Sequence, residues 1–287
     1  MKPIQLTVRL PFSYWQQHDV ETGAPLQKPE ERVLAAYMQA LLREIRSLGA
    51  DLEDVVVDSV YFAGGYMSLL SPDEFWEVMT CIRRSFQTAP DMQVSGVLFP
   101  GSLNMALISA YKNYRVGPLM LEVPSLIARE CDRLHLPNAM QALDKTVYLM
   151  QNFGVSDFGL RLPIGFEGRD EGMWQFILGQ IHHYQPLHID FADISGGTVC
   201  EPPAFEEIAQ KLVKEGFTRP TPNFFTAMKE PPRFACAARR EEAGVGLGAV
   251  SRLDGYITRN TTDIKRYIAY SADYRQLIVS AEELSEG

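Results

Sequence analysis

Apolar residues alternate with polar ones at the start of the chain and then recur at helical spacing. Ile4, Leu6, Val8 and Leu10 occupy every second position, which predicts a strand over residues 4–10 with these side chains on one face. After a polar stretch, residues 30–48 carry apolar side chains three or four positions apart, as on the buried face of an amphipathic helix. The pattern therefore changes from a period of two to a period near 3.6 within the first fifty residues.

The same change of period recurs along the chain and predicts six β–α units. Strands are expected at residues 4–10, 55–63, 94–99, 119–123, 155–163 and 187–194. Helices are expected at residues 30–48, 71–86, 102–111, 125–134, 138–153, 170–183 and 203–215. Strands joined by helices form parallel sheets with right-handed crossovers. Six units fall short of the eight that close a full barrel, so we expect an α/β fold with an open, three-quarter (β/α)6 barrel.

Helix-terminus signals support several of these boundaries. Ser71 is placed as an N-cap, with Pro72 at the first helical position and Glu74 completing a capping box. Gly154 follows the helix expected at 138–153, as a C-terminal glycine does. Asp170 is expected to cap the helix that continues to residue 183.

The pattern breaks down after residue 217, and we place a boundary there. Four prolines between residues 219 and 233 predict an irregular segment. The glycine-rich residues 244–248 predict a tight turn, a helix is expected from Thr262, and the polar tail 280–287 is expected to fray. The expected organisation is a partial barrel over residues 1–218 and a C-terminal extension over residues 219–287 packed on it.

Composition narrows the class of protein without identifying it. Of 287 residues, 46% are hydrophobic and 22% charged, which is ordinary for a globular protein. Asp and Glu outnumber Lys and Arg by 36 to 27, and the resulting charge of −9 argues against nucleic-acid or anionic-membrane partners. Neither a membrane-spanning run nor a signal-peptide core is expected, so we predict a cytoplasmic protein. The widely spaced Cys81, Cys131, Cys200 and Cys236 are interpreted as free thiols, with no metal site.

Six segments, read in order, resemble one branch of the radical-SAM superfamily, the oxygen-independent coproporphyrinogen III oxidases and heme chaperones. Residues 9–20 resemble the segment that carries the family's C-x-x-x-C-x-x-C motif, and residues 57–72 its glycine-rich loop. The other similar segments are 99–101, 133–135, 165–174 and 246–268. The resemblance implies a radical-SAM type of partial barrel and a role near tetrapyrrole or heme metabolism.

The resemblance also identifies what is missing. The three cysteines that would hold a [4Fe–4S] cluster align with Ser13, Gln17 and Val20. Cluster iron requires soft thiolate ligands, which none of these residues provides. In the glycine-rich loop, Ala63 replaces the first glycine, and Tyr66-Met67 replaces Thr-Pro. We therefore expect neither the cluster nor SAM to bind, and heme remains a candidate ligand by family analogy alone.

Two further family positions that contact SAM have changed chemically. An acidic residue of the family aligns with Val97, and an aspartate with Arg161. Neither replacement accepts a hydrogen bond from a ribose or an amine. A buried Arg161 needs a carboxylate partner. The candidates for that partner are Asp58, Glu122, Asp190 and Asp193. The alternative is that Arg161 binds an anionic ligand.

Residues at the expected barrel mouth form the candidate site, because loops at the C-terminal ends of strands build the sites of such folds. They are Tyr14, Trp15, His18, Asp19, Gly64, Gly65, Tyr66 and Arg161. The alternative is that the 13–20 loop is a surface turn, and that Tyr66 and Met67 fill the former SAM volume. His182, His183 and His188 are interpreted as structural or surface residues, because adjacent helical residues point about 100° apart.

Three functions remain open at this point. The first is a pseudoenzyme, a non-catalytic protein that binds a tetrapyrrole or an active radical-SAM partner protein. The second is an enzyme with cluster-free chemistry, for which His18, Asp19, Tyr66 and Arg161 are polar candidates. The third reading is a radical-SAM coproporphyrinogen oxidase-like enzyme with unusual cluster ligands. The missing thiolates favour the first reading.

Overall fold

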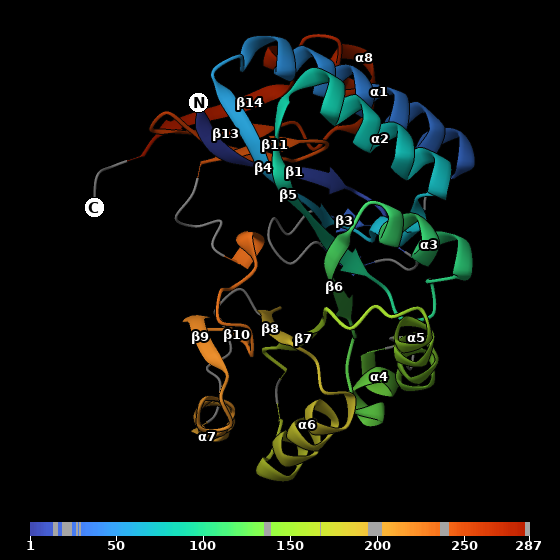
Figure 1. The fold of residues 1–287 in the computed structure, drawn as a ribbon, viewed down its shortest axis with the longest axis vertical. Coiled ribbons are helices and arrows are strands. Elements are labelled where there is room, and N and C mark those ends of the chain that lie inside the picture. Colours follow the sequence, from blue (N-terminus) through green and yellow to red (C-terminus); the bar gives the residue numbers. More distant parts are fainter. Residues whose placement is uncertain are drawn as a thin grey trace. The chain divides into compact units, whose positions relative to one another are not determined.

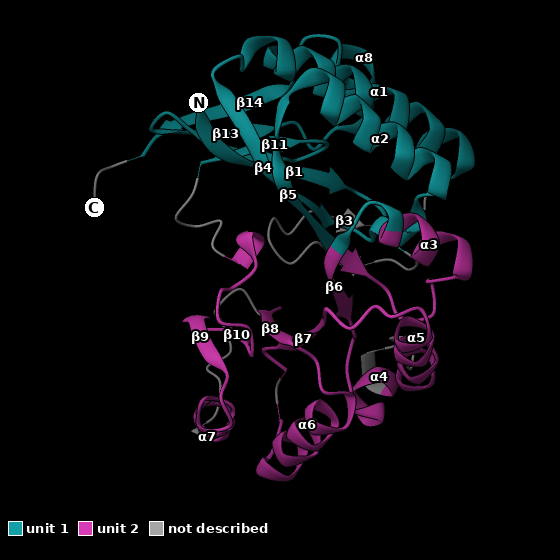
Figure 2. Ribbon diagram, viewed as in Figure 1, with its two compact units in different colours: residues 1–96, 113–116, 236–287 teal, residues 97–112, 117–235 magenta. Residues whose placement is uncertain are grey.

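The computed structural model describes residues 1–13, 17–18, 25–26, 28, 30–134, 139–166, 168–194, 203–235 and 241–284. These residues form two compact units, coloured separately in Figure 2. Unit 1 comprises residues 1–96, 113–116 and 236–287, and unit 2 comprises residues 97–112 and 117–235. Residues 219–287, expected to be one extension, therefore contribute to both units.

Strands and helices alternate through most of the chain (Figure 1). The helices are α1 (Glu31–Asp51), α2 (Pro72–Ser85), α3 (Met105–Asn113), α4 (Ala128–Leu134), α5 (Met140–Asn152), α6 (Glu171–Tyr184), α7 (Pro203–Lys214) and α8 (Ile264–Tyr270). Two short 3₁₀ helices lie at Met67–Leu69 and Tyr274–Leu277. The α/β fold class predicted from the sequence is confirmed.

Unit 1 is built on strands β1 (Lys2–Leu10), β4 (Val55–Gly64) and β5 (Gln87–Leu98), which pair in parallel. On the other side of β1 the sheet continues through β11 (Glu242–Val245), β12 (Val250–Leu253), β13 (Tyr256–Asn260) and β14 (Ile278–Glu283). Pairing is parallel between β1 and β11 and antiparallel from β11 onward. The expectation that the tail frays from residue 280 is wrong up to Glu283, because β14 pairs with β13. A small hairpin, β2 (Gln17–His18) with β3 (Pro25–Leu26), follows β1.

Unit 2 contains β6 (Val116–Glu122) from residue 117 onward, together with β7 (Phe158–Ile164) and β8 (His188–Asp193), and these three strands pair in parallel. A hairpin of β9 (Thr218–Thr221) and β10 (Phe224–Thr226) adds antiparallel pairing to β8. This hairpin corrects the irregular structure expected after residue 218. Pro220 is tolerated in β9 because β9 is an edge strand. Proline has no backbone N–H, and on an edge strand this costs no hydrogen bond to a neighbouring strand.

Each sheet buries an apolar face against helices. Ile4, Leu6, Val8 and Leu10 are buried, as the alternation predicted. In unit 1 the ring of Phe62 on β4 lies 5.5 Å from that of Phe75 on α2. In unit 2 Phe191 on β8 packs against aromatic residues of α6 and α7. Burying each such side chain contributes about 1.5–3 kcal/mol, so these faces supply much of the folding free energy.

The predicted helix caps are present. The Ser71 hydroxyl accepts a hydrogen bond from the backbone N–H of Glu74, and the Glu74 carboxylate accepts one from the backbone N–H of Ser71. The Asp170 carboxylate accepts a hydrogen bond from the Met173 backbone N–H at the start of α6. Gly154 ends α5 with a φ of 69°, a conformation that favours glycine. The sequence predicts these caps because each one depends on residues at most three positions apart.

A buried carboxylate on α1 joins the C-terminal strands of unit 1 to its helices. The side chain of Glu44 accepts hydrogen bonds from Gly246 N at 2.7 Å, Asn260 Nδ2 at 2.6 Å and Tyr267 Oη at 2.5 Å. The ring of Tyr267 on α8 stacks on that of Tyr37 on α1. Three segments distant in sequence thus converge on one side chain. Burial raises the pKa of Glu44 to about 7 despite the three hydrogen bonds, which lower it.

Glu44 should make stability fall with rising pH. Its folded-state pKa lies above its usual value of 4.5, so the folded protein retains a proton that the unfolded chain releases between pH 4.5 and about 7. Glu44 should therefore lower the free energy of unfolding by up to about 3 kcal/mol across that window. Glu44→Gln should flatten this slope in urea unfolding series at pH 5 and pH 8. Glu53→Gln, at an exposed residue, is the control. Equal slopes for parent and Glu44→Gln would contradict the assignment.

Candidate functional site

The C-terminal ends of β1 and β4 meet through their backbones. The Gly65 N–H donates to the Leu10 carbonyl, and the Tyr66 N–H donates to the Phe12 carbonyl at 3.2 Å. A Cβ atom on Gly65 would lie 1.7 Å from the Phe12 carbonyl oxygen, so only glycine fits this crossing. Gly64, the last residue of β4, has a φ of 85°, which also favours glycine. The glycine pair retained from the family loop therefore sets how closely the two loops approach.

The side chains around this crossing are buried in unit 1. Ser13 is 0% exposed, Tyr66 is 1% exposed and Met67 is 0% exposed. Met67 begins the 3₁₀ helix after β4, and a Cβ atom on Gly96 of β5 would lie 2.5 Å from its sulfur atom. Met67 thus packs directly over a glycine of the neighbouring strand. Tyr66 and Met67 are part of the core of this unit.

A row of charged residues crosses β6, β7 and β8 in unit 2. Arg161 is paired in register with Glu122 on β6 and with Asp190 on β8. Its Nε atom lies 3.2 Å from Asp190 Oδ2 and 3.7 Å from Glu122 Oε2. The side chains are 11%, 23% and 20% exposed, in the order Arg161, Asp190 and Glu122. Arg161 lies on a strand as expected, and it forms ion pairs with two of the four carboxylates named as candidates.

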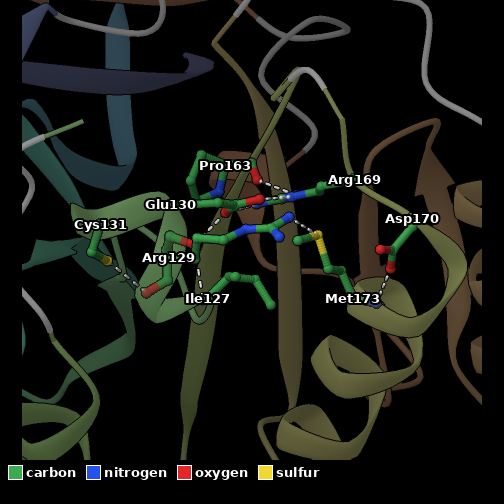
Figure 3. Close-up of polar contacts among 9 residues, drawn as sticks. Ile127, Arg129, Glu130, Cys131, Pro163, Arg169, Asp170 and Met173 are labelled. Carbon is green, nitrogen blue, oxygen red and sulfur yellow. Dashed lines mark hydrogen bonds and ion pairs between the residues drawn. The ribbon is translucent and has the colours of Figure 1, made fainter. Parts of the chain in front are cut away.

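A second ion pair, fully buried, joins two loops at the C-terminal ends of β6 and β7 (Figure 3). The Arg169 guanidinium donates to Glu130 on α4 through Nε at 2.8 Å and through Nη2 at 2.9 Å. Its Nη1 donates to the Pro163 carbonyl at the end of β7. Such a two-point contact fixes both position and orientation. The guanidinium also lies 4.6 Å from the centre of the Phe166 ring and 5.1 Å from that of Trp174.

The Glu130 carboxylate also contacts Ser125, which follows β6. The Ser125 hydroxyl donates to Glu130 Oε2 and accepts from the Ile127 backbone N–H at 2.9 Å. The loops after β6 and β7 are therefore locked to each other through one carboxylate. Sequence reasoning missed this pair, although Arg169 lies inside the segment 165–174 that carries the family resemblance. The sequence does show an arginine next to a glycine, Gly168, whose φ is 82°. No sequence pattern near Arg169 indicates that Glu130 is its partner.

Comparison with known proteins finds curated relatives of part of the chain. No protein-family model matches the chain. A heme chaperone HemW from Synechocystis sp. is 23% identical over 161 residues, covering 55% of this chain and 38% of the relative. An oxygen-independent coproporphyrinogen III oxidase from Bradyrhizobium diazoefficiens is 22% identical over 137 residues, covering 46% of this chain and 30% of that protein. The matched part thus spans less than half the length of either curated relative.

Solved structures extend the likeness to nearly the whole chain. Coproporphyrinogen III oxidase (HemN) from Escherichia coli, a radical-SAM enzyme, superposes with a TM-score of 0.81 and 15% identity. The superposition covers 99% of this chain and 72% of that one. The chain has the radical-SAM fold. A more distant match, anSMEcpe with bound AdoMet, has a TM-score of 0.51 and 10% identity, over 75% of this chain. The predicted resemblance to the HemN and HemW branch is confirmed.

The family resemblance aligns the three cluster cysteines with Ser13, Gln17 and Val20. Ser13 offers a buried hydroxyl, Gln17 on β2 has a neutral amide, and Val20, which lies outside the described residues, has no donor atom. The two cysteines in the described part of the chain are Cys81 on α2 and Cys131 on α4, both buried. The described residues also contain no group of three or more His, Cys, Asp and Glu side chains suited to a metal ion. This donor set does not fit a [4Fe–4S] cluster, which needs thiolates.

The structure describes only some of the other residues predicted for the site. Tyr14, Trp15 and Asp19 lie outside the described residues, as do Cys200 and Cys236. His18 lies on β2, with its backbone opposite Pro25. Val97 is buried on β5. Gly64, Gly65 and Tyr66 belong to unit 1, whereas Arg161 belongs to unit 2.

The histidines of the second unit fall where the pattern placed them. His188 is the first residue of β8, and His182 lies near the end of α6, where it contacts Glu215.

Among the described helices, none has the length and apolar character needed to cross a membrane.

Arg161→Met should destabilise the protein in the absence of any ligand. The substitution removes the cation that lies between Glu122 on β6 and Asp190 on β8, in a partly buried place. We expect the free energy of unfolding to fall by about 2 kcal/mol, measured by urea unfolding. Arg259→Met, at an exposed arginine of β13, is the matched control and should change little. An Arg161→Met protein as stable as the parent would favour the other interpretation, in which Arg161 binds an anionic ligand.

Proposed function

We propose that this chain is a non-catalytic member of the HemN and HemW branch that has lost the cluster and acts by binding. Its ligand or partner is a tetrapyrrole or an active radical-SAM protein, and its location is cytoplasmic. The observation that carries the proposal is the buried Ser13 hydroxyl at the first cluster position, with Gln17 and Val20 at the other two. Hydroxyl and amide oxygens are hard donors that hold cubane iron poorly.

The glycine-rich loop supports the same conclusion. Its backbone N–H groups at Gly65 and Tyr66 donate to the carbonyls of Leu10 and Phe12. Groups engaged in this way are not available to a cofactor unless the loop opens. The burial of Tyr66 and Met67 adds an energetic obstacle, because opening would expose two large side chains. The loop is therefore better suited to a rigid scaffold than to SAM binding.

The tetrapyrrole part of the proposal depends on the curated relatives. One of them is a heme chaperone, and the other acts on coproporphyrinogen III by name. Tyr66 and Met67 are buried, so His18 is the heme ligand that we propose among the residues named for the barrel mouth. The partner-protein alternative needs no such ligand, so hemin binding distinguishes the two.

Anaerobic reconstitution with iron and sulfide should leave the protein without a stoichiometric cluster. We expect far fewer than the roughly four irons per chain of a cubane, because Ser13, Gln17 and Val20 stand at the positions that align with the family's three cluster cysteines. Calorimetry on the same sample should detect no SAM binding of micromolar affinity. Such an affinity would correspond to a binding free energy of about −8 kcal/mol. Measured iron, acid-labile sulfide and visible absorbance provide the test. A full complement of both elements, with cubane absorbance, would refute the proposal and favour a radical-SAM enzyme with unusual ligands.

If the ligand is heme, hemin titration should give a saturable Soret shift at one equivalent. His18→Ala should abolish the shift, because an axial imidazole is the strongest ligand that the 14–19 segment offers. His182→Ala, at an exposed histidine on α6, is the matched control and should leave the shift intact. Absence of a shift in the parent protein would remove the tetrapyrrole and leave the partner-protein alternative. A shift unchanged by His18→Ala would place the heme elsewhere.

A further inference from the structure

The last three strands of unit 1 and helix α8 form a self-contained C-terminal segment, residues 246–283 (Figure 1). Within this segment, β12 pairs with β13 at four register positions, and β13 pairs with β14 at five. Its pairing with the rest of the sheet is much smaller, because β12 and β11 share the single register position that joins Arg252 to Glu242. The C-terminal segment is thus cohesive within itself and only weakly attached to the strand beside it.

Much of the attachment of the C-terminal segment is to one face of α1. Tyr37, Glu44 and Ser47 are spaced seven and three residues apart, which places them on the same face of that helix. All three side chains accept hydrogen bonds from the C-terminal segment. The donors are Leu247 to Tyr37, Gly246, Asn260 and Tyr267 to Glu44, and Tyr274 to Ser47. Helix α1 is therefore the surface on which the C-terminal segment is held.

Glu44 is the member of this set whose charge changes near neutral pH. Its side chain is 1% exposed, its three donors are uncharged, and within the described residues it makes no ion pair. The other titratable or charged side chains around it are Tyr37 and Arg43 on α1, Tyr267 on α8 and Arg9 on β1. Burial raises the pKa values of Tyr37 and Tyr267 further above their usual range, so both stay neutral. Arg43 donates to a backbone carbonyl of α8.

We propose that the C-terminal segment is a pH-sensitive strap, which loosens from α1 as one piece when Glu44 loses its proton. A buried carboxylate with no cation beside it is unfavourable. Water relieves that cost once the C-terminal segment moves away, because this segment supplies all three donors to Glu44. Opening breaks one register position with β11 and the contacts to α1, so it requires less free energy than global unfolding. The inference concerns unit 1 alone and does not rest on the proposed function.

Hydrogen exchange shows whether Glu44 controls this opening. The folded protein keeps the Glu44 proton up to about pH 7, whereas the opened form releases it near pH 4.5. Opening should therefore become more favourable between these two pH values and level off above them. We expect the protection factors of residues 246–283, corrected for intrinsic amide rates, to fall about 50-fold between pH 5 and pH 8. Protection factors that do not change with pH would overturn the proposal.

The same measurement separates partial opening from global unfolding. Helix α2 is the reference, because it packs on α1 but makes no hydrogen bond to Glu44. At pH 8 the most protected amides of the C-terminal segment should have protection factors at least about tenfold lower than those of α2, with a weaker dependence on added urea. Equal protection factors and equal urea dependence in the two regions would show that only global unfolding occurs, which would overturn the strap.

Two substitutions assign the effect to the carboxylate. Glu44→Gln removes the titrating group at nearly the same shape, so protection of the C-terminal segment should be the same at pH 5 and pH 8. Glu53→Gln, at an exposed residue, is the matched control and should retain the fall seen in the parent protein. A fall that persists in Glu44→Gln would overturn the proposal.

Tyr267→Phe keeps the proposal testable if circular dichroism shows that Glu44→Gln does not fold. The Tyr267 hydroxyl donates to Glu44 and lowers its pKa, so its removal should extend the fall in protection to higher pH. Lost packing alone would lower protection equally at every pH. A Tyr267→Phe curve that levels off at the same pH as that of the parent protein would contradict the role given to Glu44.

Discussion

The carboxylate of Glu44 is the interaction on which unit 1 most depends. β1 is the central strand, with β4 on one side and β11 on the other, and β11 comes from a segment more than two hundred residues away in sequence. β1 and β11 are paired at only four positions, which contributes little free energy against the entropic cost of closing so long a loop. Glu44 adds three hydrogen bonds from the residues that follow β11, and Tyr37 adds two more through its hydroxyl, to Arg9 and from Leu247. The C-terminal strands are thus attached to both a helix and the central strand.

The two faces of that central strand follow different physical rules. Ile4, Leu6 and Val8 need only volume and exclusion of water, so any apolar neighbour satisfies them. Gln5 and Thr7 on the other face need directed partners, and Thr7 finds one in Glu242 across the boundary between β1 and β11. The buried polar chain therefore specifies which strand pairs with β1, whereas the apolar face supplies most of the free energy. Removing one member leaves the next without a partner, which makes such chains costly to alter singly.

Local rules account for the parts of this fold that the sequence could predict. The alternation in β1, the capping box at Ser71 and the position of Arg161 on a strand each depend on residues close in sequence, and each is found in the structure. The β9–β10 hairpin was missed because its prolines signal a breaker, and only an edge position makes Pro220 acceptable. β14 was missed because its polar composition fits a tail as well as it fits a strand. Of the candidate site, the glycine pair was predictable, but the partners of Glu44 and Arg169 lie too far along the chain for any local pattern to reveal.

Under the proposed function, the separation between scaffold and ligand positions explains how the fold survives the loss of its cluster ligands. The crossing of Gly65 with Phe12 involves backbone atoms, and it is indifferent to whether residue 13 is serine or cysteine. The apolar faces and the Glu44 contacts likewise involve none of the positions 13, 17 and 20. A change of side chain at those three positions therefore leaves the backbone crossing, the apolar faces and the Glu44 contacts in place. Further substitutions that fill space, such as Tyr66 and Met67, then add buried apolar area, and each such addition makes the folded loop harder to open. Under the proposed function, loss of the cluster and tighter packing reinforce each other, because a loop with no cofactor to admit gains stability from every side chain that closes it.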